Sequence, residues 1–374
     1  MSKIMTISII LLALLILAII FLVVLNPSFG GSLKGERLKR IEQSPHATNG
    51  KFQNPLPTPV QTDDVPYLKL IKEFASTSNN RVPQTPIKTH PIDLNQFGLP
   101  TEKIQVSWLG HSTVLLNIDG LSILTDPVFS KRTSPFSFVG TKAFPYTHNY
   151  NWDKLPKIDL IIISHDHYDH LDYEAIKQLK NKQTVFLTTL GVGAHLERWG
   201  IDSNRITELD WWEDFQLTSK IRITATPARH FSGRGLTNRF STLWASWVIQ
   251  APSQNVFFGA DSGYFPGFKQ IGERFGPFDL VMLECGQYSP YWPLIHMAPE
   301  ETYQAAQDLQ AKALLPIHWG KYKLSIHPWT EPVERLLQAA TDGALTIATP
   351  EVGQVFPLDS PYPSKHWWSK SERN

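Results

Sequence analysis

The run HDHYDH at residues 165–170 decides how this sequence is interpreted, because it follows directly on the apolar residues 161–163 and on Ser164. Binding sites of αβ proteins commonly lie where a strand ends and a loop begins. Imidazole and carboxylate groups are ligands that zinc favours at neutral pH. Four such ligands within six residues can serve two metal ions on the two sides of one loop. The run therefore predicts a binuclear metal site.

The flanking sequence predicts an α/β fold with a two-sheet core between helices. Asp119-Gly120, placed between two apolar runs, is a hairpin turn signal. Asp172 is the expected N-cap of the helix that follows the histidine run. We expect strands at 104–109, 113–118, 121–124, 158–163, 184–188, 221–226, 242–250, 254–259, 279–284, 313–317 and 344–348, and helices at 172–180, 191–199, 299–310 and 331–340.

The composition excludes several classes of protein. Of 374 residues, 42% are hydrophobic and 18% are charged, which is enough apolar material for a large core. The net charge is +1 and no basic stripe is present, so we expect no nucleic-acid partner. The single cysteine, Cys285, excludes an intramolecular disulfide and a cysteine-rich zinc module. Its apolar neighbours predict a buried structural thiol.

The N-terminal residues 6–25 carry no charge and are apolar except for Thr6 and Ser8. As a helix rising about 1.5 Å per residue, they would extend roughly 30 Å, the thickness of a bilayer core. We predict a single-pass membrane anchor over residues 1–25, with a cleavable signal peptide as the alternative. Lys3 precedes the segment, and the downstream basic residues begin only at Lys34. This charge pattern favours a catalytic domain on the outer, or periplasmic, side.

Three further regions follow the anchor. Residues 26–100 are rich in proline and predict a linker that wraps onto the catalytic domain, with one short helix at 65–74. Residues 101–360 form the expected hydrolase domain, and 361–374 form a tryptophan-rich tail. Trp367 and Trp368 lie beside lysines, which suits either a membrane interface or packing onto the domain.

The motif H-x-H-x-D-H after an apolar strand resembles the signature of the metallo-β-lactamase fold, an αββα sandwich of two mixed sheets flanked by helices. Longer stretches resemble the N-acylphosphatidylethanolamine-hydrolysing phospholipase D family, and the resemblance covers roughly residues 100–350. The stretches that carry it are WLGHST at 108–113, LTDPVF at 124–129, ISHDHYDHLD at 163–172, ELDWWE at 208–213, GADSGY at 259–264, RFGPFD at 274–279 and PIHWG at 316–320. The predicted membrane anchor is not a feature of the animal enzymes, and in this respect the sequence looks more like a bacterial relative.

The resemblance implies two zinc ions per chain and a complete set of ligands. The first ion would be held by His165, His167, His230 and Asp261. The second would be held by Asp169, His170, His318 and the same Asp261, which bridges. His230, Asp261 and His318 each follow an apolar stretch, which is where a ligand is expected from the residues alone. Iron or manganese would also suit nitrogen and oxygen ligands.

Three more residues belong to the expected site. His296 matches a family histidine near the metals, and we expect it to orient the substrate or to protonate the leaving group. With Asp261 and Asp169 it completes the predicted catalytic set. Asp126 resembles the carboxylate that fixes the tautomer of a ligand histidine. His111 is expected near the floor of the pocket.

The function implied is a zinc phosphodiesterase of phospholipase D type that acts on N-acylphosphatidylethanolamine or a related phospholipid. A pair of zinc ions lowers the pKa of a water held between them, and Asp261 would steer the attack on phosphorus. Ser137 and Phe138 replace a polar Gln-Tyr pair of the animal enzymes, so the head-group preference does not follow from the resemblance. A lactonase or amide hydrolase on the same site is the second hypothesis, and a non-enzymatic metal-binding envelope protein is the third. The family also suggests a homodimer.

Overall fold

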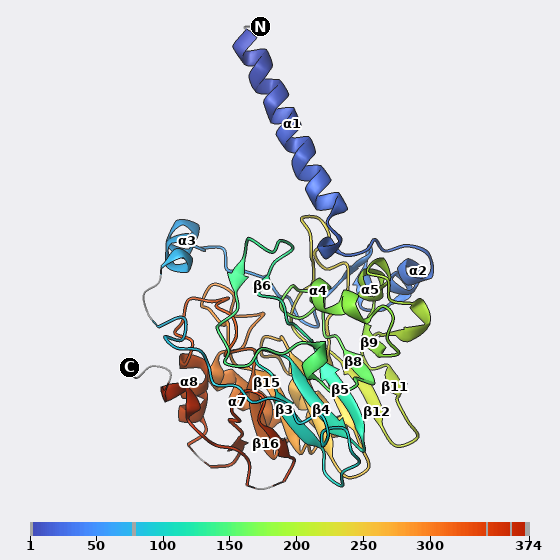
Figure 1. Ribbon diagram of the computed structural model, residues 1–374, viewed down its shortest axis with the longest axis vertical. Helices are drawn as coiled ribbons and strands as arrows, with labels where there is room; N and C mark the ends of the chain where they lie inside the picture. The colour runs from blue at the N-terminus through green and yellow to red at the C-terminus, as the bar shows by residue number, and fades with distance from the viewer. Residues whose placement is uncertain (1–2, 77–79, 342, 360, 371–374) are drawn as a thin grey trace.

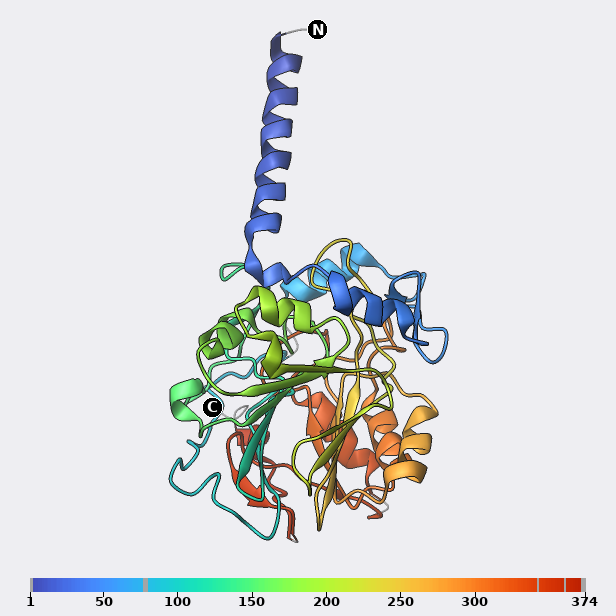
Figure 2. The ribbon, with the colours of Figure 1, turned by 90° about the vertical axis from the view of Figure 1, so that its right-hand side faces the viewer.

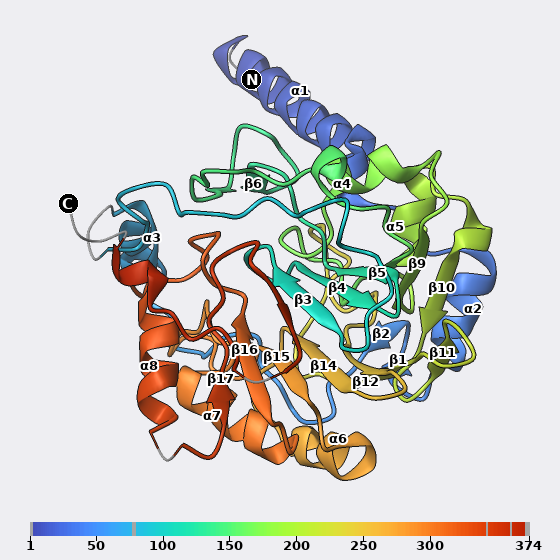
Figure 3. The ribbon, with the colours of Figure 1, turned by 60° about the horizontal axis from the view of Figure 1, so that its bottom comes forward.

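Two seven-stranded sheets pack face to face in the computed structural model of the protein. The structure describes residues 3–76, 80–341, 343–359 and 361–370, and among these the side chains at 3–4, 16–20, 22–24 and 370 are not described. The helices α6, α7 and α8 cover the outer side of one sheet, while α4 and α5 lie beside the other (Figure 3). This αββα arrangement confirms the predicted fold class.

The first sheet has the strand order β10-β9-β8-β5-β4-β3-β18. Its strands are β3 (Gln105–Trp108), β4 (Val114–Ile118), β5 (Leu121–Thr125), β8 (Leu160–Ile162), β9 (Val185–Thr189), β10 (Ile206–Leu209) and β18 (Val355–Pro357). The hairpin predicted at Asp119-Gly120 joins β4 to β5 with Ile118 opposite Leu121. Both turn residues have positive φ, as a tight hairpin turn requires.

The second sheet has the order β11-β12-β13-β14-β15-β16-β17. Its strands are β11 (Asp214–Gln216), β12 (Arg222–Thr226), β13 (Ser246–Gln250), β14 (Asn255–Ala260), β15 (Leu280–Glu284), β16 (Ala313–Ile317) and β17 (Thr346–Ile347). Strands β14, β15 and β16 are parallel, and β12 runs the same way because it is two antiparallel steps from β14. The carboxyl ends of these four strands therefore meet at one edge of the sheet.

The helices of the described residues are α1 (Lys3–Leu25), α2 (Gly35–Gln43), α3 (Tyr67–Ala75), α4 (Tyr173–Ile176), α5 (Gly193–Arg198), α6 (Gly267–Phe275), α7 (Pro299–Asp308) and α8 (Glu331–Ala339). Short 3-10 turns are η1 (Pro27–Phe29), η2 (Trp152–Lys154), η3 (Lys177–Leu179), η4 (Ser203–Arg205) and η5 (Trp367–Lys370). Two small ribbons, β1 (Ala47–Thr48) with β2 (Lys51–Phe52) and β6 (Arg132–Thr133) with β7 (Thr141–Lys142), lie outside the sheets.

Several elements differ from the sequence prediction, including α2, β10, β11 and β18, which it does not contain. The strand expected at 242–250 begins only at Ser246. The residues before it bond instead to loops of the first sheet: Leu243 N donates to Leu190 O after β9, and Ala245 N donates to Ser164 O after β8. The helix α6 was not predicted, although it buries Phe268 and Ile271 at helical spacing. Its two glycines, Gly267 and Gly272, weaken the helical signal.

Helix α1 projects away from the body of the protein (Figures 1 and 2). Its described side chains include exposed apolar residues from Met5 to Leu15. Among the described residues, no helix is both long and apolar enough to cross a membrane. The predicted anchor falls partly on positions 16–20 and 22–24, whose side chains lie outside the described residues.

The stretch after α1 bonds to the two-sheet body at several points. Arg37 of α2 pairs with Glu197 at 3.1 Å and also with Glu208. The expected short helix forms as α3. At the other end of the chain, Trp367 and Trp368 are buried, and Trp367 stacks on Trp319 with ring centroids 5.3 Å apart. The tail tryptophans therefore pack onto the domain and do not form a membrane interface.

Candidate metal centre

Histidine and carboxylate side chains converge where the strand ends of the two sheets meet. His165 follows β8, while His230, Asp261 and His318 follow β12, β14 and β16. Ligand atoms of His165, His167, His230 and Asp261 all lie within 4.8 Å of one another, and a second such group contains His111, Asp169, His170 and His318. All seven predicted ligands are therefore brought together.

Asp261 lies between the two groups. Its carboxylate oxygens are 3.0 Å from His318 Nδ1 and 3.2 Å from His170 Nε2. The same carboxylate is 3.6 Å from His230 Nε2 and 3.9 Å from His165 Nε2. One carboxylate in contact with histidines of both groups is the arrangement that a bridging ligand needs.

The second group differs from the prediction in one member, because His111 occupies it beside Asp169. The buried His111 ring donates from Nε2 to Asp169 Oδ2 over 3.0 Å. His111 and His318 both have positive φ. Two backbone hydrogen bonds join their loops: His318 N donates to His111 O, and His111 N donates to Trp319 O. Their rings lie 4.1 Å apart. His111 is thus in contact with the predicted ligands, not merely near the pocket floor.

The donor set fits metal ions on its own chemistry. Burial lowers the pKa of His165, His230 and His318 well below the ordinary value, so these rings are neutral and keep a lone pair. Within the described residues, the buried His170 Nε2 has no hydrogen-bond partner, although it faces Asp261 and Asp169. An unsatisfied buried nitrogen among carboxylates is costly unless a cation lies nearby.

Asp126 holds His170 in place from behind. Its carboxylate accepts from His170 Nδ1 at 2.8 Å, from Ser164 N at 2.8 Å and from Ser164 Oγ at 2.5 Å. Because Nδ1 carries the proton that is donated, Nε2 is directed toward the centre. Burial lowers the pKa of His170, but Asp261, Asp169 and Asp126 together raise it well above its ordinary value. Without a metal, this ring would hold a proton where an ion fits.

His296 lies at the same edge and pairs with a residue that the sequence prediction missed. Glu284, at the end of β15, accepts from His296 Nδ1 at 2.6 Å and from Ser262 N at 2.7 Å. Burial raises the pKa of Glu284 to about 7. Burial also lowers the pKa of His296, but Glu284 and Asp261 raise it to about 9. A lone acid in an otherwise apolar strand was the available signal for Glu284.

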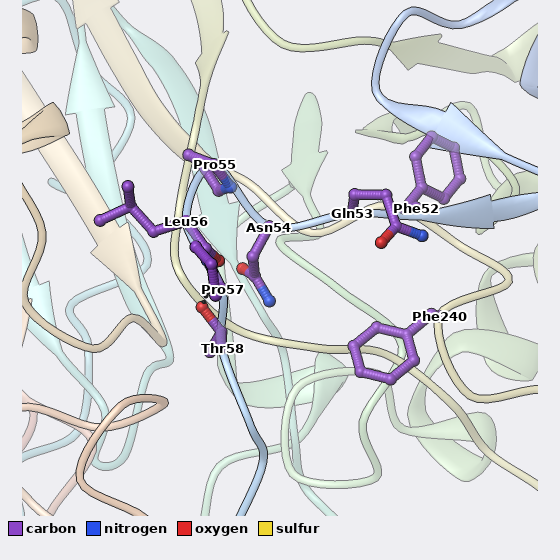
Figure 4. A pocket seen from close by; sticks show the side chains of 8 residues that line it. All are labelled: Phe52, Gln53, Asn54, Pro55, Leu56, Pro57, Thr58 and Phe240. Carbon is purple, nitrogen blue, oxygen red and sulfur yellow. Dashed lines mark hydrogen bonds between the residues drawn. The ribbon is translucent and has the colours of Figure 1, made fainter.

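Asn54 is a second residue that the prediction missed, and it comes from the predicted linker. Its side-chain amide donates to His230 O at 2.7 Å and accepts from His230 N at 2.9 Å. Figure 4 shows Asn54 among the side chains of residues 52–58 that line a cavity of about 350 Å³ together with Phe240. The linker therefore clamps the backbone of a candidate ligand.

The metal cluster opens into a separate cavity of about 230 Å³. Apolar and polar groups line it outside the cluster: Val60, Gln61, Phe231, Arg239, Gln287, Trp292, Ile295 and Leu324. Arg239 is exposed and lies over the Phe231 ring, 5.3 Å from its centroid. Thr62 N donates to Tyr291 O, so the linker crosses from the His230 loop to the loop that precedes His296.

Comparison with known proteins places this centre in a family. The profile of the family described as "Beta-lactamase superfamily domain" matches residues 122–319. An uncharacterized protein of Mycobacterium tuberculosis is 43% identical over 332 residues, covering 87% of this chain and 88% of the relative. The N-acyl-phosphatidylethanolamine-hydrolyzing phospholipase D 1 of Caenorhabditis elegans is 33% identical over 271 residues, covering 69% of this chain and 76% of the relative.

A solved structure shares the fold. The metallo hydrolase Igni18 of the archaeon Ignicoccus hospitalis superposes with a TM-score of 0.52 at 21% identity, covering 68% of this chain and 97% of its own. The matched profile includes β5, β8, the 165–170 run, β12 to β16 and His318, which are the elements that build the centre. The chain therefore belongs to the β-lactamase superfamily, in its metallo-β-lactamase branch of metal-dependent hydrolases.

Proposed function

We propose that the protein is a binuclear zinc phosphodiesterase of phospholipase D type, acting on N-acylphosphatidylethanolamine or a related phospholipid. The observation that carries the proposal is the position of His296, which is held by Glu284 beside Asp261 in a cavity that Arg239 also lines. The similarity to the nematode phospholipase supports the substrate class.

Two groups of side chains would hold the zinc ions. The first is His165, His167, His230 and Asp261, and the second is Asp169, His170 and His318 with Asp261 shared. Ions bound there would supply Lewis-acid charge and favour the ionisation of water. His111 would keep Asp169 ionised and oriented through its Nε2 hydrogen bond.

The chain's own residues divide the remaining work. Arg239 would attract the anionic phosphodiester to the mouth of the cavity. His296 would donate a proton from Nε2 to the departing oxygen, because Glu284 accepts from Nδ1 and leaves Nε2 as the free donor. Phe231, Trp292 and Leu324 line the cavity and would exclude bulk water from the reacting centre.

The bilayer is the proposed partner, and the outer side of a membrane remains the predicted location. The N-terminal helix α1 exposes apolar side chains, which supports a contact between this helix and lipid.

The test compares substrates on one preparation of the full chain in mild detergent, with its metal content measured. N-acylphosphatidylethanolamine, a chromogenic phosphodiester, a lactone and a β-lactam are assayed in parallel. We expect about two zinc ions per chain, turnover of both phosphodiesters, and loss of turnover in His167→Ala. The exposed His366 serves as the matched control, and His366→Ala should retain full activity. Two bound metals with lactone turnover alone would replace the proposal by a lactonase.

A further inference from the structure

The side of the body from which α1 emerges carries an unusual set of exposed apolar side chains. Leu236 is 92% exposed, Leu68 is 79% exposed and Phe138 is 75% exposed. Tyr67, Ile71 and Val139 are also exposed. They come from α3, from the loop between β6 and β7, and from the loop after His230. Large apolar side chains at loop tips are unfavourable in water unless a partner covers them.

Contacts at the base of α1 place two of these segments together. Asn26 Nδ2 donates to Pro135 O at 2.8 Å, and Phe29 contacts Phe136 with ring centroids 6.0 Å apart. From the other loop, Arg234 Nε donates to Ser28 O at 2.8 Å. Figures 1 and 2 show α3 on this same side of the body in both views. We call the three segments 67–75, 130–142 and 231–240 the apolar face.

Helix α3, which supplies the segment 67–75, has apolar residues on two sides. Leu70 is buried against the body, while Tyr67, Leu68 and Ile71 point to solvent. Lys69 and Lys72 are exposed on the same short helix. A surface helix with apolar residues outward and lysines at their flanks has the pattern of an interfacial helix, whose apolar side enters the headgroup region.

Charge identifies the partner. The apolar face presents six exposed or half-buried basic residues and one acid, Glu73, which pairs with Lys69 at 3.8 Å. The basic residues are Lys69, Lys72, Lys131, Arg132, Lys142 and Arg239, whereas Arg234 of the same segment is buried. A second copy of the chain would bring the same sign of charge to this face, whereas anionic lipid headgroups complement it.

We propose that the apolar face docks on the surface of a phospholipid bilayer that contains anionic lipid. The metal cavity shares segments with this face: Arg239 belongs to the Leu236 loop, and Val60 and Gln61 precede α3. Docking thus brings the cavity mouth to the headgroups. This inference deepens the proposed function, because a phospholipid substrate has to be drawn from a bilayer.

The decisive experiment measures lipid contact at single positions of the full chain. Cys285 is fully buried, so Leu68→Cys, Phe138→Cys and Leu236→Cys each offer one accessible thiol for a polarity-sensitive dye. The proteins are reconstituted in phosphatidylcholine–phosphatidylglycerol vesicles, with and without lipids brominated in their acyl chains. Leu99→Cys is the matched control, because Leu99 is exposed beside the β4–β5 hairpin, at the end of β4 remote from His111.

We expect brominated lipid to quench the dye at the three test positions and to leave the Leu99 position unchanged. Absence of quenching at the test positions would overturn the proposal. A blue shift that depends on protein concentration and not on brominated lipid would assign the face to a second copy of the chain instead.

A second arm separates docking from catalysis. The double variant Leu68→Asp/Leu236→Asp should lose about tenfold in turnover of vesicle-borne lipid, because two apolar contacts become charged. Its turnover of the soluble chromogenic phosphodiester should stay unchanged, as should both rates in Leu99→Asp. Equal rates on vesicles for the double variant and the native chain would contradict docking. Should the native chain hydrolyse no phosphodiester at all, the proposed function fails while dye quenching still decides the docking surface.

Discussion

At the scale of single residues, the centre depends on side chains that position the candidate ligands. Asp126 directs His170, Glu284 directs His296, and Asn54 holds the backbone of His230. Outer contacts of this kind commonly change metal affinity as much as tenfold to a hundredfold. They are therefore the places where a small substitution separates structure from chemistry.

Asn54→Ala should weaken metal binding, because the His230 loop loses both amide hydrogen bonds. We expect about tenfold lower affinity in a chelator competition. Gln53→Ala is the control, since the Gln53 side chain bonds only to Lys51 O among the described contacts. Asn54→Asp keeps the acceptor for His230 N but loses the donor to His230 O, so its metal affinity should lie between those of the native chain and Asn54→Ala. Native affinity in Asn54→Ala would show that the clamp is not needed.

His296→Ala should reduce turnover according to the leaving group. An alkoxide needs the proton from His296, so the loss should be about a hundredfold or more on a lipid substrate. A nitrophenolate leaves without help, so the chromogenic phosphodiester should lose much less. Comparing kcat for both substrates checks this role. Equal losses on the two substrates would assign His296 to substrate positioning.

At the scale of elements, the sequence predicted the strands that carry the centre because they are short, apolar and followed by polar ligands. β8 and β16 have this pattern, and each ends directly before a histidine loop. Pairing among distant segments was not predictable in the same way. Nothing near Asn54 indicates that it contacts His230, since 176 residues separate them. The pairing of Glu284 with His296 was also not predictable, because it depends on how the loop between β15 and α7 folds back over the end of β15.

The C-terminal turn η5 supports the loop after β16. Trp368 is buried and packs edge-on against Trp319, which follows His318. Trp368→Ala should lower the free energy of unfolding by about 3 kcal/mol, because a large cavity opens behind this loop. Urea unfolding checks the value. The exposed Phe138 is the matched aromatic, and Phe138→Ala should change stability by less than about 0.5 kcal/mol.

At the scale of the whole molecule, the two sheets are tied together near the centre by a buried lysine. Lys321, after β16, donates from Nζ to Val128 O in the loop after β5, at 2.6 Å. Burial lowers the pKa of Lys321 to about 8. The folded protein therefore binds fewer protons than the unfolded chain between this value and the ordinary pKa of 10.5.

The free energy of unfolding should consequently gain about 3 kcal/mol from this group as the pH rises from 8 to 10.5. Lys321→Met removes the titrating group and should not show this gain. The free energy of unfolding of the native chain, relative to that of the variant, should therefore rise with pH over this range. Urea unfolding at a series of pH values measures it. A constant difference would mean that Lys321 titrates normally in the folded state.

The stretch directly after α1 shares its hydrogen bonds with the metal loop. Gly31 N donates to His195 Nδ1, and His195 Nε2 bonds to Asp166 between the first two candidate ligands. Arg234 bonds both to Ser28 O and to Asp166 O. The residues that follow α1 are therefore part of the folded body, although α1 itself projects away from it. A chimera that grafts another leader onto this body would have to join it before Ser28. A junction after Gly31 would remove the backbone atoms that bond to the buried side chains of His195 and Arg234, which hold the loop at Asp166.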